Sequence, residues 1–142
     1  MRILLASGSS GGHIFPALAL MDYLKINGAT VLLVLPKSKE SRIPVDCGDV
    51  EYINAAALSF NLSSKNISGV YSFLRGAWKS LRIIIKFRPD AVVGFGSLNT
   101  VALLFWAWLF RVKTIIHEQN VIPGRANRLL ARFVDRVAVS FA

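Results

Sequence analysis

Residues 2–28 read RILLASGSSGGHIFPALALMDYLKING, and this stretch decides the fold. Residues 2–6 form a short apolar segment that predicts a strand, and residues 16–27 show helical spacing, with Pro16 in the first turn and Gly28 as a stop. The segment between them is the glycine-rich turn Ser7-Gly8-Ser9-Ser10-Gly11-Gly12-His13. The chain therefore begins as a strand, a glycine loop and a helix.

Strands and helices alternate along the rest of the chain as well. Further strands are predicted at residues 30–35, 50–54, 90–94, 114–117 and 136–140, further helices at 69–87, 98–111 and 124–133, and a polar loop at 54–68. Because the predicted strands are apolar throughout rather than at every second position, they favour a parallel sheet with helices on both faces. The predicted fold class is therefore α/β, with ligands bound beyond the carboxyl ends of the strands.

The composition predicts one globular domain over residues 1–142, because 54% of the residues are apolar. The single cysteine, Cys47, cannot form an internal disulfide, which fits a reducing compartment. The apolar segment at residues 3–7 is shorter than the core of a signal peptide, and the run at 101–110 is about half of a bilayer-spanning helix. We therefore expect a cytosolic chain that does not cross a membrane.

The net charge of +9 indicates an anionic partner: nucleic acid, a phosphorylated substrate or an anionic lipid surface. In the predicted helix at 69–87, spacings of 4, 3 and 4 residues align four basic side chains in one stripe: Arg75, Lys79, Arg82 and Lys86. The opposite, apolar arc is expected to hold Val70, Phe73, Leu74, Ala77, Leu81, Ile84 and Ile85. Tyr71 and Trp78 lie at the border between the two arcs, a position that suits a water–lipid interface.

Two interpretations of this helix remain open: a core-facing helix with a solvated basic face, and a helix that contacts a membrane. Ile83 on the expected polar side, and the apolar cluster at 105–108, favour the membrane. The expected membrane contacts are Arg75, Trp78, Lys79, Arg82, Lys86 and Trp106. Nucleic-acid binding would explain the charge but not the apolar border, so we expect no nucleic-acid partner.

The glycine loop fits an anionic ligand. Gly8, Gly11 and Gly12 let backbone amides approach an oxyanion, and the following helix presents its positive dipole end, so a phosphate or diphosphate is expected. The alternative is a tight turn without a ligand. No Lys-Ser/Thr follows the last glycine, and no acidic residue ends the second strand, so neither ATP nor a nicotinamide cofactor is expected. His13 is a candidate general base or, alternatively, a cap of the turn.

A second polar loop follows the strand predicted at residues 114–117. It reads His117-Glu118-Gln119-Asn120 and continues through Pro-Gly to Asn127. The two histidines of the chain lack zinc-site spacing, so this loop is typical of hydroxyl and phosphate recognition, and no metal is expected. Because parallel strands end at one edge, this loop, the glycine loop and residues 94–97 are expected to converge on one cleft.

Three motifs together resemble the MurG glycosyltransferases over nearly the whole chain. They are GSSGGHIFPALA at residues 8–19, RPDAVVGFG at 88–96 and HEQNVIPGRAN at 117–127. The resemblance implies the Rossmann-like, acceptor-binding N-terminal half of a GT-B enzyme, which transfers N-acetylglucosamine from UDP-N-acetylglucosamine to an undecaprenyl-diphosphate-linked muramoyl-pentapeptide in peptidoglycan synthesis. It also implies a peripheral protein on the cytoplasmic face of the inner membrane, without a cofactor. The donor-binding domain is expected in cis or in trans, because the chain ends about where the family's first domain ends.

Site roles carry over by position. Ser10, Gly11, Gly12, Gly96, His117, Asn120 and Asn127 are implied substrate-binding residues, and His13 and Glu118 the catalytic ones. The family usually has a glycine and a tyrosine where this chain has Ser97 and Leu98, so one polar contact is missing. A non-catalytic module that docks on a membrane or prenyl-diphosphate lipid and recruits a donor-binding chain is the alternative function.

Overall fold

The computed structural model describes residues 1–37, 49–53 and 65–141, with the side chains of 65–73 and Asn99 excepted. The strands in these ranges are β1 (Arg2–Ala6), β2 (Thr30–Pro36), β3 (Val50–Ile53), β4 (Ala91–Gly94), β5 (Lys113–Glu118) and β6 (Arg136–Val139). The helices are α1 (Gly11–Ile26), α2 (Lys65–Phe87), α3 (Leu98–Leu109) and α4 (Arg125–Leu130). In these described ranges, no helix combines the length and hydropathy that a bilayer span requires.

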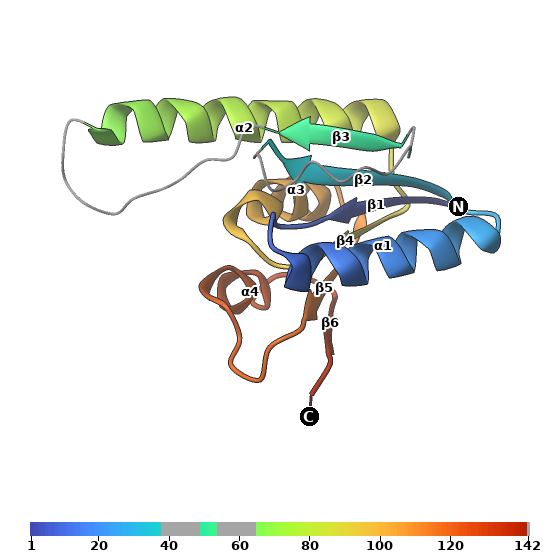
Figure 1. The fold of residues 1–142 in the computed structure, drawn as a ribbon. Helices are drawn as coiled ribbons and strands as arrows, with labels where there is room; N and C mark the ends of the chain where they lie inside the picture. The colour runs from blue at the N-terminus through green and yellow to red at the C-terminus, as the bar shows by residue number, and fades with distance from the viewer. Residues whose placement is uncertain (38–48, 54–64, 142) are drawn as a thin grey trace.

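All strand pairs are parallel, and the sheet has the order β3-β2-β1-β4-β5-β6. Helix α1 covers one face, and α2, α3 and α4 contribute to the core on the other (Figure 1). The predicted parallel sheet with helices on both faces is therefore confirmed. The chain leaves β1 and β4 toward opposite sides of the sheet, which opens a crevice at the carboxyl ends of these two strands.

Strand β1 shows why the apolar segments are continuous. Leu4 and Leu5 are both fully buried, but they belong to different cores. Leu5 packs with α1, through Ile14 and other residues, and Leu4 packs with α3, through Leu104 and other residues. A strand that is buried on both faces needs an apolar side chain at every position.

Most element boundaries lie within a few residues of those predicted, with three informative differences. Helix α1 begins at Gly11, because the Ser10 carbonyl accepts hydrogen bonds from the N–H groups of His13 and Ile14. Pro16 is therefore inside the helix rather than in its first turn. Strand β5 extends through Glu118, and α2 begins four residues early, at Lys65. The remainder of the loop predicted at residues 54–68 lies outside the described residues, as does Cys47.

The orientation of α2 differs from the prediction. Ile83, expected on the polar side, is buried together with Ile84, whereas Leu74 and Ile85, expected on the same apolar arc as Ile84, are 60% and 55% exposed. Gly76 and Ser80 are buried as well, and helical spacing places them on the same face as Ile83 and Ile84, which share a core with residues of α3. We call this buried face the seam of α2. The larger apolar side chains Leu74 and Ile85 lie on the opposite face. The side chains of Val70, Tyr71 and Phe73 lie outside the described residues.

Trp106 holds α2 and α3 together. Its indole N–H donates a hydrogen bond of 2.9 Å to the carbonyl of Ala77 in α2, and its ring is half-buried. The exposed aromatic side chains of this part of α3 are instead Phe105 and Trp108, with Phe110 directly after the helix. Trp106 therefore packs against α2 in this structure, and its expected membrane contact stays a prediction.

Candidate active site

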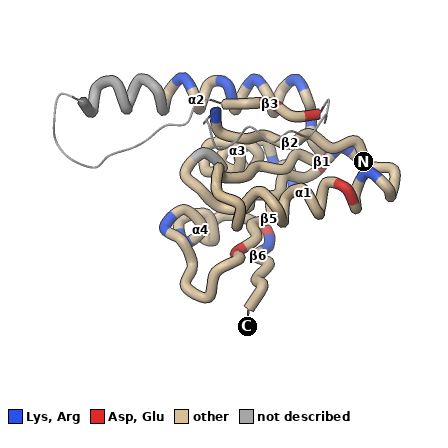
Figure 2. The backbone as a smooth tube through the Cα atoms, in the orientation of Figure 1, with Lys and Arg blue, Asp and Glu red and all other residues tan. Residues whose placement is uncertain are grey.

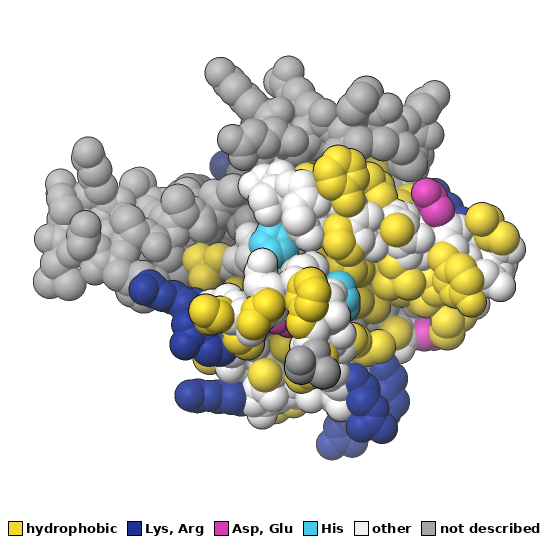
Figure 3. Space-filling model, turned by 60° about the horizontal axis from the view of Figure 1, so that its bottom comes forward, with side chains coloured by type: hydrophobic (Ala, Val, Ile, Leu, Met, Phe, Trp, Pro, Cys, Tyr) yellow, Lys and Arg dark blue, Asp and Glu magenta, His cyan; other side chains and the backbone are white. Residues whose placement is uncertain are grey.

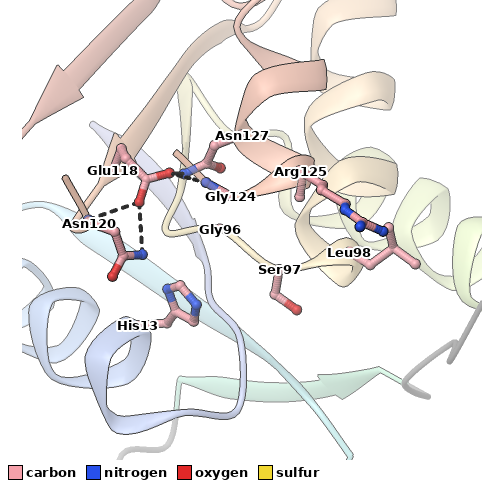
Figure 4. A pocket seen from close by; sticks show the side chains of 10 residues that line it. His13, Gly96, Ser97, Leu98, Glu118, Asn120, Gly124, Arg125 and Asn127 are labelled. Atoms are coloured by element: carbon pink, nitrogen blue, oxygen red, sulfur yellow. Dashed lines mark hydrogen bonds between the residues drawn. The ribbon is translucent and has the colours of Figure 1, made fainter. Parts of the chain in front are cut away.

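A pocket of about 300 Å³ lies at the carboxyl edge of the sheet (Figure 4). Its lining comes from the first turn of α1, the β4–α3 connection and the segment from the end of β5 into α4. The lining residues are His13, Gly96, Ser97, Leu98, Glu118, Asn120, Gly124, Arg125, Ala126 and Asn127. The predicted convergence of three loops is therefore confirmed. Figure 3 shows histidine side chains (cyan) at the surface of this side of the molecule, with hydrophobic side chains (yellow) beside them.

Glu118 organises one wall of the pocket. Its Oε1 accepts hydrogen bonds of 3.0 Å from both the backbone N–H and the side-chain amide of Asn120. Its Oε2 accepts bonds of 3.0 Å from the backbone N–H of Gly124 and the amide of Asn127. Burial raises the pKa of Glu118, but these four hydrogen bonds together outweigh burial and hold its pKa below the ordinary 4.5. The carboxylate is therefore ionised at neutral pH, and its oxygens already hold four donors.

Asn127 presents an acceptor without a partner. Its Nδ2 donates to Glu118 at 3.0 Å and to the carbonyl of His117 at 3.2 Å. Both of these partners only accept, so they fix which way the amide is turned. The residue is 4% exposed, and its Oδ1 has no hydrogen-bond partner among the described residues. Buried side-chain oxygens are rarely left unpaired, so the bonds that Nδ2 makes to Glu118 and His117 are favoured over a partner for Oδ1.

His13 lies in a slot between two glycine backbones. A Cβ atom on Gly8 would lie 3.0 Å from Cδ2 of His13, and one on Gly96 would lie 3.1 Å from Cε1. Gly96 also has a φ of +84°, a conformation that glycine adopts readily. Both glycines therefore make room for the imidazole at the pocket.

Other predicted site residues lie outside the lining of this pocket. Side chains alternate along β5, so His117 points away from the face that Glu118 occupies; its ring packs edge-on against Phe95, with centroids 5.6 Å apart. Nε2 of His117 lies 3.2 Å from Oγ of Ser140. Ser10, Gly11 and Gly12 are exposed at the N-terminal end of α1.

Sequence reasoning did not select three residues near His13. Arg125 lines the pocket as the first residue of α4, and a cation directly after Pro-Gly was the available signal. Gln119 makes a hydrogen bond to His13 that the sequence does not reveal. Ser97 has a φ of +82° and a ψ of 150°, a combination that is almost restricted to glycine.

A parallel sheet of this order, with a polar pocket at the carboxyl ends of its strands, defines a Rossmann-like ligand-binding domain. Residues 3–139 match the family model described as the glycosyltransferase family 28 N-terminal domain. The chain belongs to this family.

Curated and solved relatives agree with this assignment. The UDP-N-acetylglucosamine--N-acetylmuramyl-(pentapeptide) pyrophosphoryl-undecaprenol N-acetylglucosamine transferase of Lactiplantibacillus plantarum is 41% identical over 145 residues, covering 99% of this chain and 40% of the relative. MurG of Acinetobacter baumannii has the same fold with a TM-score of 0.78 at 24% identity, over 99% of this chain and 42% of that one. The resemblance to MurG is thereby confirmed, and the chain spans about two fifths of these relatives.

The fold alone does not determine the reaction. The UDP-GlcNAc 2-epimerase of Methanocaldococcus jannaschii matches with a TM-score of 0.68 at 13% identity, over 96% of this chain and 38% of that one. An epimerase and a transferase thus share this architecture, and any functional argument has to come from the pocket.

We predict that Ser97→Gly stabilises the protein. Residues other than glycine pay about 1–3 kcal/mol in this backbone region, and Ser97 makes no side-chain capping bond that glycine would lose. Part of the gain is offset by the larger entropy of glycine in the unfolded chain, so an increase of about 1 kcal/mol in the free energy of unfolding is expected in urea titrations. Ser97→Ala is the matched control and should give no such increase. Equal effects of both variants would contradict a backbone origin.

Glu118→Gln should destabilise the protein, and the loss should depend on pH. In the variant, the NH₂ group of the glutamine replaces one carboxylate oxygen and faces N–H groups that are themselves donors. The expected cost is about 1–3 kcal/mol at neutral pH. Because folding lowers the pKa of Glu118, its ionised form contributes stability above 4.5, and this contribution is lost as the pH falls through the lowered folded-state pKa. The difference between wild type and variant should therefore shrink below pH 4.5.

Urea titrations at neutral and acidic pH measure this difference. Asp22→Asn, which changes an exposed carboxylate on α1, is the control and should alter the free energy of unfolding by less than about 0.5 kcal/mol. A constant difference between wild type and Glu118→Gln across the pH range would show that ionisation of Glu118 contributes nothing.

Proposed function

We propose that this chain is the acceptor-binding half of an inverting glycosyltransferase. The proposed reaction moves N-acetylglucosamine from UDP-N-acetylglucosamine to an undecaprenyl-diphosphate-linked muramoyl-pentapeptide in peptidoglycan synthesis. The relative from Lactiplantibacillus plantarum is named for this activity. The observation that carries the proposal is the pocket itself, whose lining combines the imidazole of His13 with the side chains of Asn120 and Asn127. These groups fit a sugar whose hydroxyl must be both positioned and deprotonated.

His13 is the proposed general base. Its Nε2 accepts the proton of the acceptor hydroxyl while that oxygen forms a bond to the anomeric carbon of the donor sugar. The bond between the anomeric carbon and the diphosphate oxygen breaks, and its electron pair leaves with UDP. Glu118 is less suited to this role than its residue type implies, because its two oxygens already accept four hydrogen bonds. We propose that Glu118 instead holds Asn120 and Asn127 in place.

Anionic groups of the substrates have two complementary partners here. The exposed first turn of α1 carries Ser10, Gly11 and Gly12 at the positive end of the helix dipole. Arg125 adds a cation at the pocket. We propose that these groups, with the amide of Asn120, contact diphosphate or the nucleotide sugar, and that no metal is required. Within the described residues, no three potential metal ligands cluster together.

The relatives extend well beyond the part that this chain matches. We propose that a donor-binding domain, in the same protein or in a separate one, supplies the remaining contacts to UDP-N-acetylglucosamine. A pocket that opens at the carboxyl edge of the sheet is suitable for such a second domain, because the donor then meets the acceptor across the opening.

The outer face of α2 is the proposed membrane contact, at the cytoplasmic face of the membrane. Leu74, Trp78 and Ile85 are exposed in one stripe, directly beside the basic stripe, which Figure 2 shows along the outside of α2. The basic side chains are Arg75, Lys79, Arg82 and Lys86, of which Lys79 also donates to the carbonyl of Tyr52. Paired apolar and basic stripes suit a headgroup region better than bulk water.

The chain alone should transfer no sugar, and joining it to a donor-binding domain of a relative should restore transfer. In that joined enzyme, His13→Ala should lower turnover by about 10²- to 10⁴-fold, the usual cost of losing general-base help. The measurement is release of UDP with the lipid-linked acceptor. His13 lies at the end of α1 rather than in the core, so the free energy of unfolding should change by less than about 0.5 kcal/mol.

Glu118→Gln is the matched comparison. A larger loss of turnover for this variant than for His13→Ala, at equal stability, would move the role of base to Glu118. Unchanged turnover in both variants would contradict catalysis by this pocket and would favour the non-catalytic, lipid-docking alternative.

The proposed membrane surface predicts binding to anionic lipid vesicles that weakens with salt, because exposed charges are screened over about 8 Å at physiological ionic strength. Replacing Arg75, Lys79, Arg82 and Lys86 with glutamine should abolish this binding in vesicle sedimentation. The control removes the same charge elsewhere, at the exposed residues Lys113, Arg128, Arg132 and Arg136. Equal losses in both variants would mean that net charge, and not this surface, causes the binding.

A further inference from the structure

The carboxamide of Gln119 lies between His13 and the backbone of Phe95. Its Oε1 is 3.2 Å from Nδ1 of His13, and its Nε2 is 3.3 Å from the carbonyl oxygen of Phe95. The side chain is half-buried and follows directly after β5. One carboxamide therefore connects the first turn of α1 to the residue that follows β4.

The chemistry of these groups determines the direction of both hydrogen bonds. A backbone carbonyl only accepts, so the NH₂ group of Gln119 must face Phe95. The carbonyl oxygen of the same carboxamide then faces His13, and it also only accepts. Nδ1 of His13 must therefore donate, and a neutral imidazole with its proton on Nδ1 has its lone pair on Nε2. Through Gln119, the Phe95 carbonyl determines which nitrogen of His13 can accept a proton.

The surrounding backbone confines the ring to one slot. A Cβ atom on Gly8 or Gly96 would make an unusually tight contact with Cδ2 or Cε1 of the ring. A half-turn of the ring would place Cδ2 opposite Gln119 and break the hydrogen bond. Among the described residues, Nε2 has no hydrogen-bond partner, and the ring lines the pocket.

We propose that Gln119 is a positioning residue, which holds neutral His13 in the tautomer whose Nε2 lone pair is available in the pocket. This inference rests on the proposed function, in which Nε2 accepts the proton of the acceptor hydroxyl. When the ring takes up that proton, its Nδ1–H bond to Oε1 becomes charge-assisted and stronger. Gln119 orients the ring but does not accept the proton, so its carboxamide stays neutral throughout the reaction.

The test reads the tautomer directly in the chain by nitrogen-15 NMR, at a pH where the imidazole is neutral. Protonated and unprotonated ring nitrogens differ widely in chemical shift, and His13→Ala identifies which signals belong to His13 rather than His117. Wild type should carry the proton on Nδ1. Gln119→Met keeps the length of the side chain but removes both hydrogen bonds, and the proton should move in part to Nε2. Gln119→Glu keeps an acceptor toward Nδ1 and should keep the proton there.

Val121→Met is the matched control, because it places the same side chain in the same loop at a position that is 78% exposed. It should change neither the tautomer nor transfer. In the enzyme joined to a donor-binding domain, Gln119→Met should lower kcat on the order of tenfold, the worth of one hydrogen bond, with KM for the acceptor nearly unchanged. Gln119→Glu should recover part of this loss.

The outcomes separate this inference from the proposed function. A proton on Nε2 in wild type, or a proton that stays on Nδ1 in Gln119→Met, would overturn the positioning role whatever happens to transfer. A tautomer that changes as expected while His13→Ala leaves transfer intact would support the positioning role and contradict His13 as the base. A loss of kcat with an unchanged tautomer would reduce Gln119 to a structural residue.

Discussion

The arrangement of the site depends on one buried carboxylate. Glu118 is 3% exposed, and burying an ion is costly unless its hydrogen-bonding capacity is filled. Four donors from Asn120, Gly124 and Asn127 meet this need, so the segment between β5 and α4 closes around the carboxylate. The same closure turns Asn127 so that its oxygen remains unpaired. Because β5 and β1 end at the same edge of a parallel sheet, this wall forms opposite the helix that carries His13.

The sheet could be predicted from the sequence because its signal is simple. Strands that are buried on both faces are apolar at every position, as Leu4 and Leu5 illustrate. The orientation of α2 could not be predicted in this way. Its buried seam contains Gly76 and Ser80, which carry little hydrophobic signal, while larger apolar side chains point outward. A face that is buried through small residues has little hydrophobic signal, so the apolar pattern of the sequence does not identify it.

The site residues also divide into those that the sequence identifies and those that only the structure reveals. His13, Asn120 and Asn127 were identifiable as polar residues at strand ends, and the structure brings them to one pocket. Gln119 has the same local signal as its neighbours, yet its contact with His13 joins residues 106 positions apart in sequence. Conversely, His117 has the residue type of a site residue, but it lies on the face of β5 opposite Glu118 and packs against Phe95. The face of His117 could not be assigned from the sequence, because β5 extends one residue further at each end than expected and includes Glu118.

The two-sided character of α2 has a consequence for sequence divergence. Its inner seam, with Gly76 and Ser80, is buried on the same face as Ile83 and Ile84, and added volume in a packed interior is destabilising. Its outer stripe, with Leu74, Trp78 and Ile85, contacts no other part of the core and is free of that constraint. Related chains are therefore expected to keep small residues at the seam while the identity and spacing of the outer side chains vary more freely. In this helix, the small buried positions, rather than the large apolar ones, are those that evolution should preserve.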